Sequence, residues 1–544
     1  MYVKKRHLEM LRYLEQGGKA LKEKFPEEYE ARVLELYIMG LVEDGKLTEQ
    51  GKILWEITRE LNLEEIPELF VDTSIATMLE EYAKSGILLP TWEEPLKARK
   101  LIDEEGLTEV GKKVLKFAQT YEPNLYISPE MVGLIYGLPP VGKEAKLRQY
   151  AIDAYGSDNV VNAMEAVKLL VISPPDENNR KTYAFTRAHE YVKQILPKDL
   201  EKPLILSKDE MKALYEDTSG ESEFYSKGEI TQKGMEALTL YEHLVQPEKR
   251  IAPSYLSEKE FAVLKTIRRI EEIHKHTPDI TPTYREIRER GGFEKLMNLL
   301  YFLEVKRLVE QREDGWWLTQ LGHKALEYET FTIEASRALT MPKNNQAPAP
   351  YWLEKAHEEG LLTDGYITGK GIFALKLSES KDTFYLTKYD AWLLSAIPRA
   401  RYLKWEEIEQ KVPEDYEKDF LGEAEAKNLV EVLHNQTIGL TPLGEEIKLA
   451  IEKAKIDDIK ATEFPITPLF YKVLKHFYEN HERLVNLWKE RGYSRMVVQI
   501  IKETGLYVDE VKKALVVLRN LGFIGKLGLT ESGKRIVEAM KYLQ

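Results

Sequence analysis

The sequence predicts a mainly α fold with small β-hairpins (α+β), built as a tandem array of similar units. The chain has 544 residues, enough for three or four domains at about 150 residues each. A short pattern, consisting of an aliphatic residue, Thr, two variable residues and Gly, recurs along the chain. Helical periodicity surrounds the copies, so the repetition indicates duplicated units rather than one large domain.

The copies are unevenly spaced, which excludes a strict solenoid and favours complete units mixed with shortened ones. They read LTEQGK, LTEVGK, ITQKGM, LTQLGH, ITGKGI, LTPLGE and LTESGK, and they begin at Leu47, Leu107, Ile230, Leu318, Ile367, Leu440 and Leu529. FTRAHE at Phe185 is a decayed copy. We expect units at 1–62, 63–123, 124–200, 254–340, 384–460 and 461–544, with shortened units at 201–253 and 351–383. The segment MPKNNQAPAP, residues 341–350, lacks periodicity and apolar bulk, and it is expected to be a linker.

The end of the chain displays the plan of one unit most clearly. One apolar helical face contains Met496, Val497, Ile500 and Ile501, and the sequence ETGLY then breaks the helix. A second helical face, with Val508, Val511, Leu515 and Leu518, ends at Gly522. Two short extended pieces follow around Gly525 and Gly528, and helical periodicity resumes at Gly533. The predicted order is therefore helix, turn, helix, hairpin and helix.

The recurring threonine and glycine have predicted structural roles. Thr48, Thr108, Thr319 and Thr530 should each cap the next helix through the hydroxyl group, and the glycine three residues later should let that helix pack closely. Other helix starts are capping boxes at Ser207 and Ser257, with looser variants at Ser128, Thr387 and Thr467.

This pattern resembles the winged helix-turn-helix superfamily, in the prokaryotic form where GLV or GFI leads into a wing and LTxxGK follows it. The whole arrangement is also similar to the large, uncharacterised tandem winged-helix proteins of hyperthermophilic archaea and bacteria. The resemblance implies a tandem array of winged helix-turn-helix units. Since winged helices bind DNA, RNA and other proteins, it implies no particular function.

Composition limits the possible partners and the compartment. There are 78 Lys and Arg against 91 Asp and Glu, a formal charge of −13, so any contact with nucleic acid must be local. Cysteine is absent, which excludes disulfides and thiolate chemistry, and no apolar run is long enough for a membrane helix. We expect a cytoplasmic protein without membrane partners. The 31% of charged residues fits a thermophile.

Motifs for catalysis are incomplete, so we expect neither an enzyme nor a cofactor or metal site. GLPPVGKE from Gly137 has Glu144 where a phosphate-binding loop needs Ser or Thr, and two prolines remove backbone donors. HEYVK, HEEGL and HERLV lack the second histidine of a zinc-protease helix.

The last unit is the most basic part of the chain. From Arg483 to Lys526 there are nine basic and four acidic residues, a local charge of +5. A second helix and a wing that carry basic side chains could reach phosphates, although a solvated helix face has the same composition. The predicted nucleic-acid-binding residues of this unit are Arg491, Arg495, Lys502, Lys512, Lys513, Arg519 and Lys526.

Two further candidates lie in the unit at 254–340, where acidic residues offset the basic ones. Arg307 is one of them. Trp316 and Trp317 alternate along the expected wing strand, so one should face the core and the other should face outward, where it could stack on a base. Trp316 is taken as the candidate.

Three functions from different classes remain. The first is an adaptor that docks on a nucleic-acid-rich machine, weakly favoured to be a ribosomal subunit, where it could block subunit joining or bridge subunits. Its partners would be rRNA and ribosomal proteins, or DNA and RNA polymerase. The second is a DNA-binding transcriptional regulator, and the third is a protein-binding scaffold, which could be a homodimer. The adaptor ranks first because it alone uses both the overall charge of −13 and the basic last unit.

Overall fold

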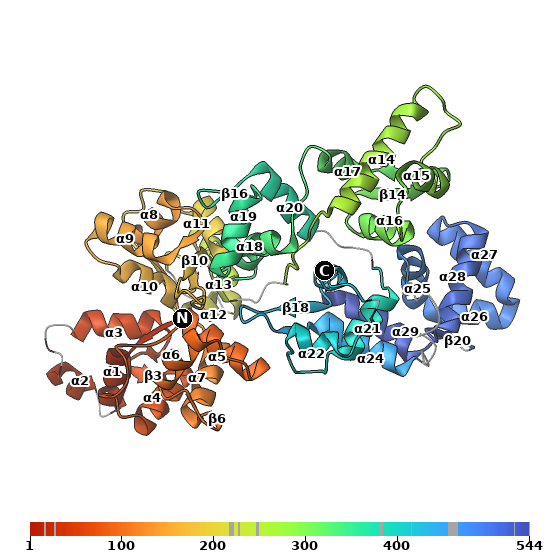
Figure 1. The fold of residues 1–544 in the computed structure, drawn as a ribbon. Coiled ribbons are helices and arrows are strands. Elements are labelled where there is room, and N and C mark those ends of the chain that lie inside the picture. Colours follow the sequence, from red (N-terminus) through yellow and green to blue (C-terminus); the bar gives the residue numbers. More distant parts are fainter. Residues whose placement is uncertain are drawn as a thin grey trace. The chain divides into compact units, whose positions relative to one another are not determined.

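The computed structural model describes residues 1–15, 18–24, 26, 29–216, 222–226, 229–245, 250–379, 384–414, 416–454, 466–526 and 528–542. The chain divides into two compact units. The first unit contains Met1–Glu248 and Met341–Ile367, and the second contains Lys249–Thr340 and Thr368–Gln544. Each unit draws on two separate stretches of sequence (Figure 1).

In the first unit, helices alternate with short antiparallel strand pairs. Its first half contains β1 (Tyr2–Lys4), α1 (Lys5–Glu15), α2 (Gly18–Lys24), α3 (Tyr29–Ile38), β2 (Val42–Glu43), β3 (Lys46–Leu47), α4 (Glu49–Glu60), β4 (Leu69–Asp72), α5 (Thr73–Ser85), α6 (Pro90–Lys97), β5 (Ile102–Asp103), β6 (Gly106–Leu107) and α7 (Glu109–Thr120). Its second half contains β7 (Leu125–Ile127), α8 (Pro129–Gly137), β8 (Val141–Lys143), α9 (Glu144–Tyr155), α10 (Asn159–Ala166), β9 (Leu170–Ile172), β10 (Thr182–Phe185), α11 (Ala188–Ile195), β11 (Leu204–Leu206), α12 (Lys208–Glu216), β12 (Tyr225–Ser226), β13 (Glu229–Ile230) and α13 (Gln232–Val245), with α19 (Pro350–Glu358), β16 (Leu362–Thr363) and β17 (Tyr366–Ile367) from further along the chain.

The second unit repeats this plan. It contains α14 (Glu258–His274), α15 (Tyr284–Gly291), α16 (Leu296–Val305), β14 (Val309–Arg312), β15 (Gly315–Leu318), α17 (Gln320–Ala325), most of α18 (Ile333–Lys343), α20 (Gly369–Glu379), α21 (Lys388–Ala396), α22 (Trp405–Glu409), α23 (Asp419–Ala426), β18 (Val430–Val432), β19 (Ile438–Leu440), α24 (Pro442–Lys453), α25 (Pro468–Glu479), α26 (His481–Arg491), α27 (Tyr493–Thr504), α28 (Val508–Asn520), β20 (Ile524–Gly525), β21 (Gly528–Leu529), α29 (Glu531–Ala539) and a 3-10 turn, η1 (Met540–Tyr542). The predicted mainly α fold with small β-hairpins is confirmed.

The threonine-glycine pattern forms a clasp between a hairpin and the helix that follows it. The Thr48 hydroxyl donates to the carbonyl of Gly40 at 2.7 Å and accepts from the amide of Gly51 at 3.1 Å. The backbone amide of Thr48 donates to Leu41 at 3.0 Å. A Cβ atom on Gly51 would lie 2.1 Å from the Leu41 carbonyl oxygen, so a larger residue cannot be accommodated. Both predicted roles, the cap and the close approach, are confirmed.

The same clasp recurs with the same geometry. Thr108, Thr319, Thr441 and Thr530 all cap the helix that follows, and a Cβ on Gly111, Gly322, Gly444 or Gly533 would lie 1.9–2.2 Å from a backbone carbonyl. The capping predictions at Ser128, Ser257, Thr387 and Thr467 are likewise confirmed. At Ser207, the side chain accepts from the Glu210 amide at 3.0 Å, as expected for a capping box.

Corresponding contacts in the two halves of the chain show an internal duplication. In the first half of the chain, strand β1 pairs with β4. In the second half, a single β-bridge between Leu256 and Phe331 takes the position of that strand pair. Strand β7 pairs with β11, and the bridge between Leu386 and Ile466 repeats that contact.

A buried glutamate also recurs at corresponding positions of the two halves. It is Glu165 in α10 and Glu425 in α23. The Thr73 amide donates to Glu165 at 2.9 Å, and burial raises the pKa of Glu165 to about 7. In the second half, the Arg337 guanidinium donates to Glu425 at 2.9 Å.

The core of the second unit holds a cluster of buried charges, which we call the buried lysine cluster. It consists of Tyr255, Glu260, Phe302, Lys306, Tyr385, Asp390 and Lys427. The Lys306 ammonium lies 2.6 Å from Glu260, and the Lys427 ammonium lies 2.7 Å from Asp390. Lys306 lies 4.0 Å from the ring centres of Tyr255 and Phe302, and Lys427 lies 4.4 Å from that of Tyr385. Each cation therefore has one close carboxylate partner and is enclosed by aromatic faces, and Lys427 also lies 3.9 Å from Glu423.

The segment 341–350 is not a linker, which corrects the prediction. Its first residues complete α18, Pro350 begins α19, and 347–350 are buried. The Thr182 hydroxyl donates to the Pro348 carbonyl, and the Arg187 amide donates to Asn345 at 3.0 Å. The small side chains of Ala347 and Ala349 suit close packing, and composition alone cannot distinguish that from a solvated connection.

Several expected unit boundaries either differ from those of the structure or touch residues that it does not describe. The range 351–383, expected as a shortened unit, is divided between the two compact units after Ile367. The expected boundaries at 383/384 and 460/461 touch residues outside the described ranges. Among the described residues, no helix combines the length and apolar character that crossing a membrane requires.

Candidate nucleic-acid interface

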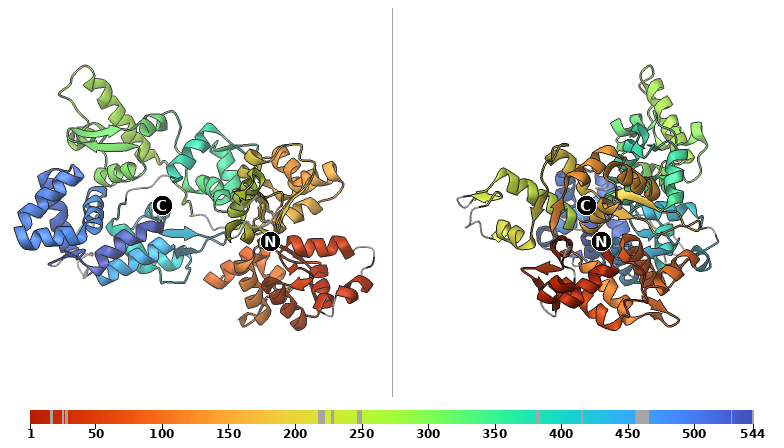
Figure 2. Two further views of the ribbon diagram at one scale, coloured as in Figure 1. Left: turned by 180° about the vertical axis from the view of Figure 1, so that it is seen from behind. Right: turned by 90° about the vertical axis from the view of Figure 1, so that its left-hand side faces the viewer.

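The carboxy-terminal unit, residues 466–542, carries most of the predicted binding residues. Helix α25 supplies a buried face, with Val473, Leu474 and Phe477, against which α27 and α28 pack. Helix α27 ends at Thr504 and Gly505 has a φ of +69°, which reverses the chain into α28. The four helices α25 to α28 form one cluster, coloured blue in Figure 1 and visible from behind in Figure 2.

All seven basic residues predicted in this unit are exposed. Arg491 lies at the end of α26, Arg495 and Lys502 lie on α27, and Lys526 lies in the hairpin turn. Lys512, Lys513 and Arg519 lie on α28, whose opposite face buries Val511, Ala514, Leu515 and Leu518. In the part of the chain that the structure describes, none of the seven forms an ion pair. Their charges are thus available to an external anion.

The charge along α28 is uneven. Its first turn carries Asp509 and Glu510, whereas its middle and end carry Lys512, Lys513 and Arg519. Two exposed valines interrupt this surface, since Val508 is 47% and Val516 is 53% exposed. The basic surface therefore runs toward the carboxyl end of the helix.

An aromatic residue joins the end of α28 to α26 and α27. The Arg519 guanidinium lies over the ring of Trp488 on α26, 5.2 Å from its centre. The ring of Tyr493, at the start of α27, meets Trp488 edge-on with the centres 5.9 Å apart. Because Arg491 follows Trp488 by one helical turn, these contacts bring basic residues of α26 and α28 together.

The helices that precede the other hairpins do not offer such a face. Helix α10 buries Val161, Met164 and Glu165, and α23 buries Phe420, Leu421 and Glu425. Helix α6 exposes Glu93 and Glu94, and α19 exposes Glu354 and Glu358.

Trp316 is not a surface residue, which corrects its selection as a binding residue. It is 3% exposed and packs edge-on against Tyr301, with ring centres 5.7 Å apart. Trp317 is the outward-facing ring: its indole N–H donates to Asp314 at 2.8 Å, and Arg312 lies 5.5 Å from its centre. The prediction that one ring faces inward and the other outward is confirmed, with the roles opposite to those chosen.

Arg307 is exposed, and its backbone has a φ of +58°, in the left-handed region. It lies in the turn between α16 and β14, far in sequence from the carboxy-terminal unit. Nearby arginines are engaged in ion pairs within their own helix, because Arg285 pairs with Glu289 at 2.7 Å and Arg290 pairs with Glu286. The charges of Arg285 and Arg290 are thus offset by carboxylates of their own helix.

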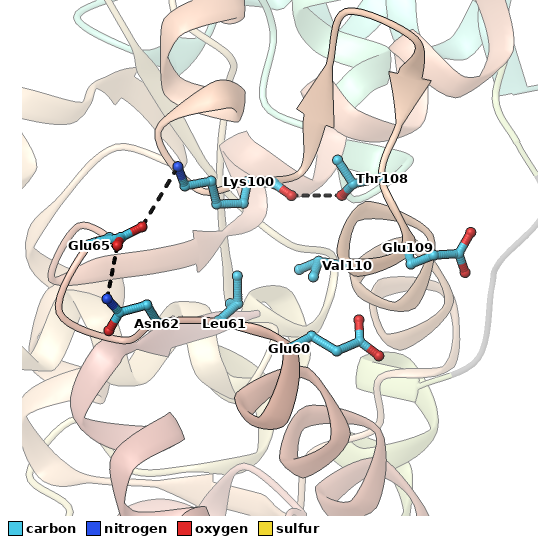
Figure 3. A pocket seen from close by; sticks show the side chains of 8 residues that line it. All are labelled: Glu60, Leu61, Asn62, Glu65, Lys100, Thr108, Glu109 and Val110. Carbon is cyan, nitrogen blue, oxygen red and sulfur yellow. Dashed lines mark hydrogen bonds and ion pairs between the residues drawn. The ribbon is translucent and has the colours of Figure 1, made fainter.

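A hollow in the first unit has the opposite electrostatic character. It has a volume of about 480 Å³ and lies between the end of α4 and the start of α7. Three of its lining residues are glutamates, Glu60, Glu65 and Glu109. Figure 3 shows the one lining lysine, Lys100, reaching toward Glu65 at 3.8 Å. Its carboxylates would repel a phosphate, so this hollow is no candidate for nucleic acid.

Sequence reasoning missed Trp488 and Val516, and it placed Val508 on the apolar face of its helix, whereas the structure leaves Val508 47% exposed. Trp488 lies one turn before Arg491, a signal that was present in the sequence. The partnership between Trp488 and Arg519 spans two helices and a turn, so it required the fold. In the described ranges, His, Asp and Glu residues form no group of three that could hold a metal ion.

The fold and the surface define a mainly α, tandemly duplicated protein with one basic terminal unit. The chain belongs to the family described as "Protein of unknown function (DUF505)", whose model matches residues 1–294 and again 290–540. It is 37% identical over 567 aligned residues, covering 99% of both chains, to "Uncharacterized protein MJ1355" of Methanocaldococcus jannaschii. No solved structure matched the chain. The double family match agrees with a tandem duplication of the chain.

Proposed function

We propose that this protein is a non-enzymatic adaptor of tandem winged-helix units that docks on a nucleic-acid-rich machine in the cytoplasm. A ribosomal subunit is the favoured machine. The carboxy-terminal unit supplies the nucleic-acid contact, and the remaining, acidic surface meets basic proteins.

The observation that carries this proposal is the exposed face of α28. Lys512, Lys513 and Arg519 project from the helix that follows the turn and precedes the hairpin, which is the recognition position of a winged helix. Free cations at this position neutralise phosphates and release counterions.

The acidic remainder supports an adaptor rather than a free nucleic-acid binder. A formal charge of −13 repels phosphates at long range, so a partner must supply a compensating basic surface. Basic proteins on the machine would provide it.

The test is sedimentation of a native cell lysate through a sucrose gradient, with the protein followed by an antibody. We expect co-migration with ribosomal subunits, lost when Lys512, Lys513 and Arg519 are all changed to Glu. The matched control changes Lys259, Lys265 and Arg269 to Glu, which are exposed on α14 and give the same change in charge. Association that survives the first triple change but weakens in the control would contradict the proposal.

Two alternatives give different results in the same gradient. A DNA-binding transcriptional regulator would leave the subunit fractions and follow chromosomal DNA until nuclease treatment. A protein-binding scaffold would be insensitive to both nuclease and charge reversal on α28.

A further inference from the structure

We infer that the carboxy-terminal unit binds a single-stranded stretch of nucleic acid on the surface formed by Trp488, Tyr493 and Arg519, with α28 lying along the strand instead of entering a duplex groove. This inference rests on the proposed function and specifies its substrate class. Three features of the unit support it.

The first feature is the charge distribution on α28. A recognition helix that reads a duplex places its amino-terminal residues against the base edges. In α28 those residues are Asp509 and Glu510, which would face the phosphates on either side of the groove. The cations lie further along, from Lys512 to Arg519, and continue onto α26 at Arg491. At 1.5 Å per residue, Lys512 and Arg519 are separated by about 10 Å along the helix, enough to follow two or three phosphates of one strand.

The second feature is the hairpin after α28, which is short and packed against α26. Strands β20 and β21 have two residues each. Gly528 has a φ of +113°, and a Cβ there would lie 2.5 Å from His481 and 2.7 Å from Val485, both on α26. A hairpin packed in this way is poorly placed to enter a groove beside the helix. Lys526 can still meet a phosphate from its tip.

The third feature is the stacked pair of Trp488 and Arg519. Bases of single strands stack on aromatic rings and on arginine guanidinium planes, and this contact tolerates any base. Trp488 is partly exposed, and it supports the Arg519 guanidinium at 5.2 Å. Tyr493 extends the aromatic surface to the start of α27. The pair thus offers a platform for a base beside a row of phosphate-binding cations.

The experiment measures binding of the full-length protein to fluorescent oligonucleotides of about 12 nucleotides, within the length that single-strand sites cover. The probes are an oligo(U) RNA, an oligo(dT) DNA and a DNA duplex of the same length, each tested at low and moderate salt. We expect the single strands to bind at least about tenfold more tightly than the duplex. The RNA and DNA arms identify which single strand is preferred.

The decisive variant is Trp488→Leu, and its matched control is Trp317→Leu. Trp317 also lies under an arginine, Arg312, but on β15 outside the carboxy-terminal unit. Loss of the Trp488 ring should weaken single-strand binding about tenfold or more, and the control should not. Trp488→Phe keeps a stacking ring in case Trp488→Leu unfolds, and it should retain most of the binding while Arg519→Ala loses it.

The outcomes separate this inference from the proposed function. Tighter binding to the duplex, or single-strand binding that neither Trp488→Leu nor Arg519→Ala weakens, would overturn the inference. The proposed function would survive if the triple change on α28 still abolished ribosome association. If the wild-type protein bound none of the probes and did not co-sediment, both would fail.

Discussion

At the scale of single residues, Glu304 links the chemistry of a carboxyl group to the stability of the second unit. It lies near the end of α16, where burial raises its pKa to about 7, and Lys472 on α25 opposes that rise. A carboxyl in the unfolded chain has a pKa of about 4.5. Between these two pH values the folded state retains a proton that the unfolded state has released. Stability should therefore fall as the pH rises from about 4.5 to about 7.

Glu304→Gln should raise the melting temperature at pH 8 and leave it nearly unchanged at pH 4.5. The gain at pH 8 is about 1–3 kcal/mol, because the glutamine has no charge to desolvate. Calorimetry across this pH range measures it. The control is Glu313→Gln, an exposed residue of the hairpin turn. Equal gains at both pH values would mean that packing, not ionisation, accounts for the effect.

Single residues also show where sequence reasoning stops. Alternation along a strand predicts that Trp316 and Trp317 face opposite ways, but it does not determine which ring faces the core. That choice depends on the position of Tyr301, which packs on Trp316 from α16.

At the scale of elements, the threonine-glycine clasp is the feature that most directly sets how a hairpin packs against the helix that follows it. Gly51→Ala should destabilise the first unit by about 2–3 kcal/mol, because the new methyl group would lie 2.1 Å from the Leu41 carbonyl oxygen. The matched control is Gly422→Ala in α23, where the nearest atoms are 3.9 and 4.0 Å away. That change should stabilise its helix by about 0.5–1 kcal/mol.

Chemical denaturation of both glycine variants measures these differences. If Gly51→Ala left the free energy of unfolding unchanged, the hairpin and the helix could move apart without cost. The clasp would then not determine how a hairpin packs against its helix.

The elements were predictable to the extent that they depend on local sequence. The caps at Thr48 and Thr530 use atoms within three residues of the cap, so the pattern was sufficient. The packed state of 341–350 depends on Thr182 and Arg187, more than 150 residues away, and the sequence gives no local sign of it. The basic residues of α28 could be predicted because charge follows directly from residue type. The contact between Trp488 and Arg519 could not be predicted, because it depends on how two helices pack.

At the scale of the whole molecule, the two family copies do not coincide with the two compact units. The family model matches 1–294 and 290–540, but Met341–Ile367 packs in the first unit. Trp92 on α6 and Trp352 on α19 are both 1% exposed, and both follow a proline at the start of their helix by two residues. One belongs to each copy, yet both lie in the first unit.

Trp92→Ala and Trp352→Ala should therefore lower the midpoint temperature of the same thermal transition. Each should reduce the free energy of unfolding by about 3–5 kcal/mol. Lys306→Met, which leaves Glu260 without its buried partner, marks the transition of the second unit and should cost a similar amount. Differential scanning calorimetry of the full chain compares the three. If Trp352→Ala moved the transition that Lys306→Met moves, the assignment of Met341–Ile367 to the first unit would be wrong.

The buried lysine cluster has a consequence for how the protein responds to heat. Water orders strongly around free ions, so hydrating Lys306, Lys427 and their carboxylates carries an unfavourable entropy that grows in weight as temperature rises. The free-energy cost of desolvating these four charges therefore decreases. The electrostatic attraction within each pair remains, because the charged atoms lie 2.6 and 2.7 Å apart. The cost of burying these charges therefore falls as temperature rises, and the cluster should contribute more to the stability of the second unit at high temperature than at 25 °C.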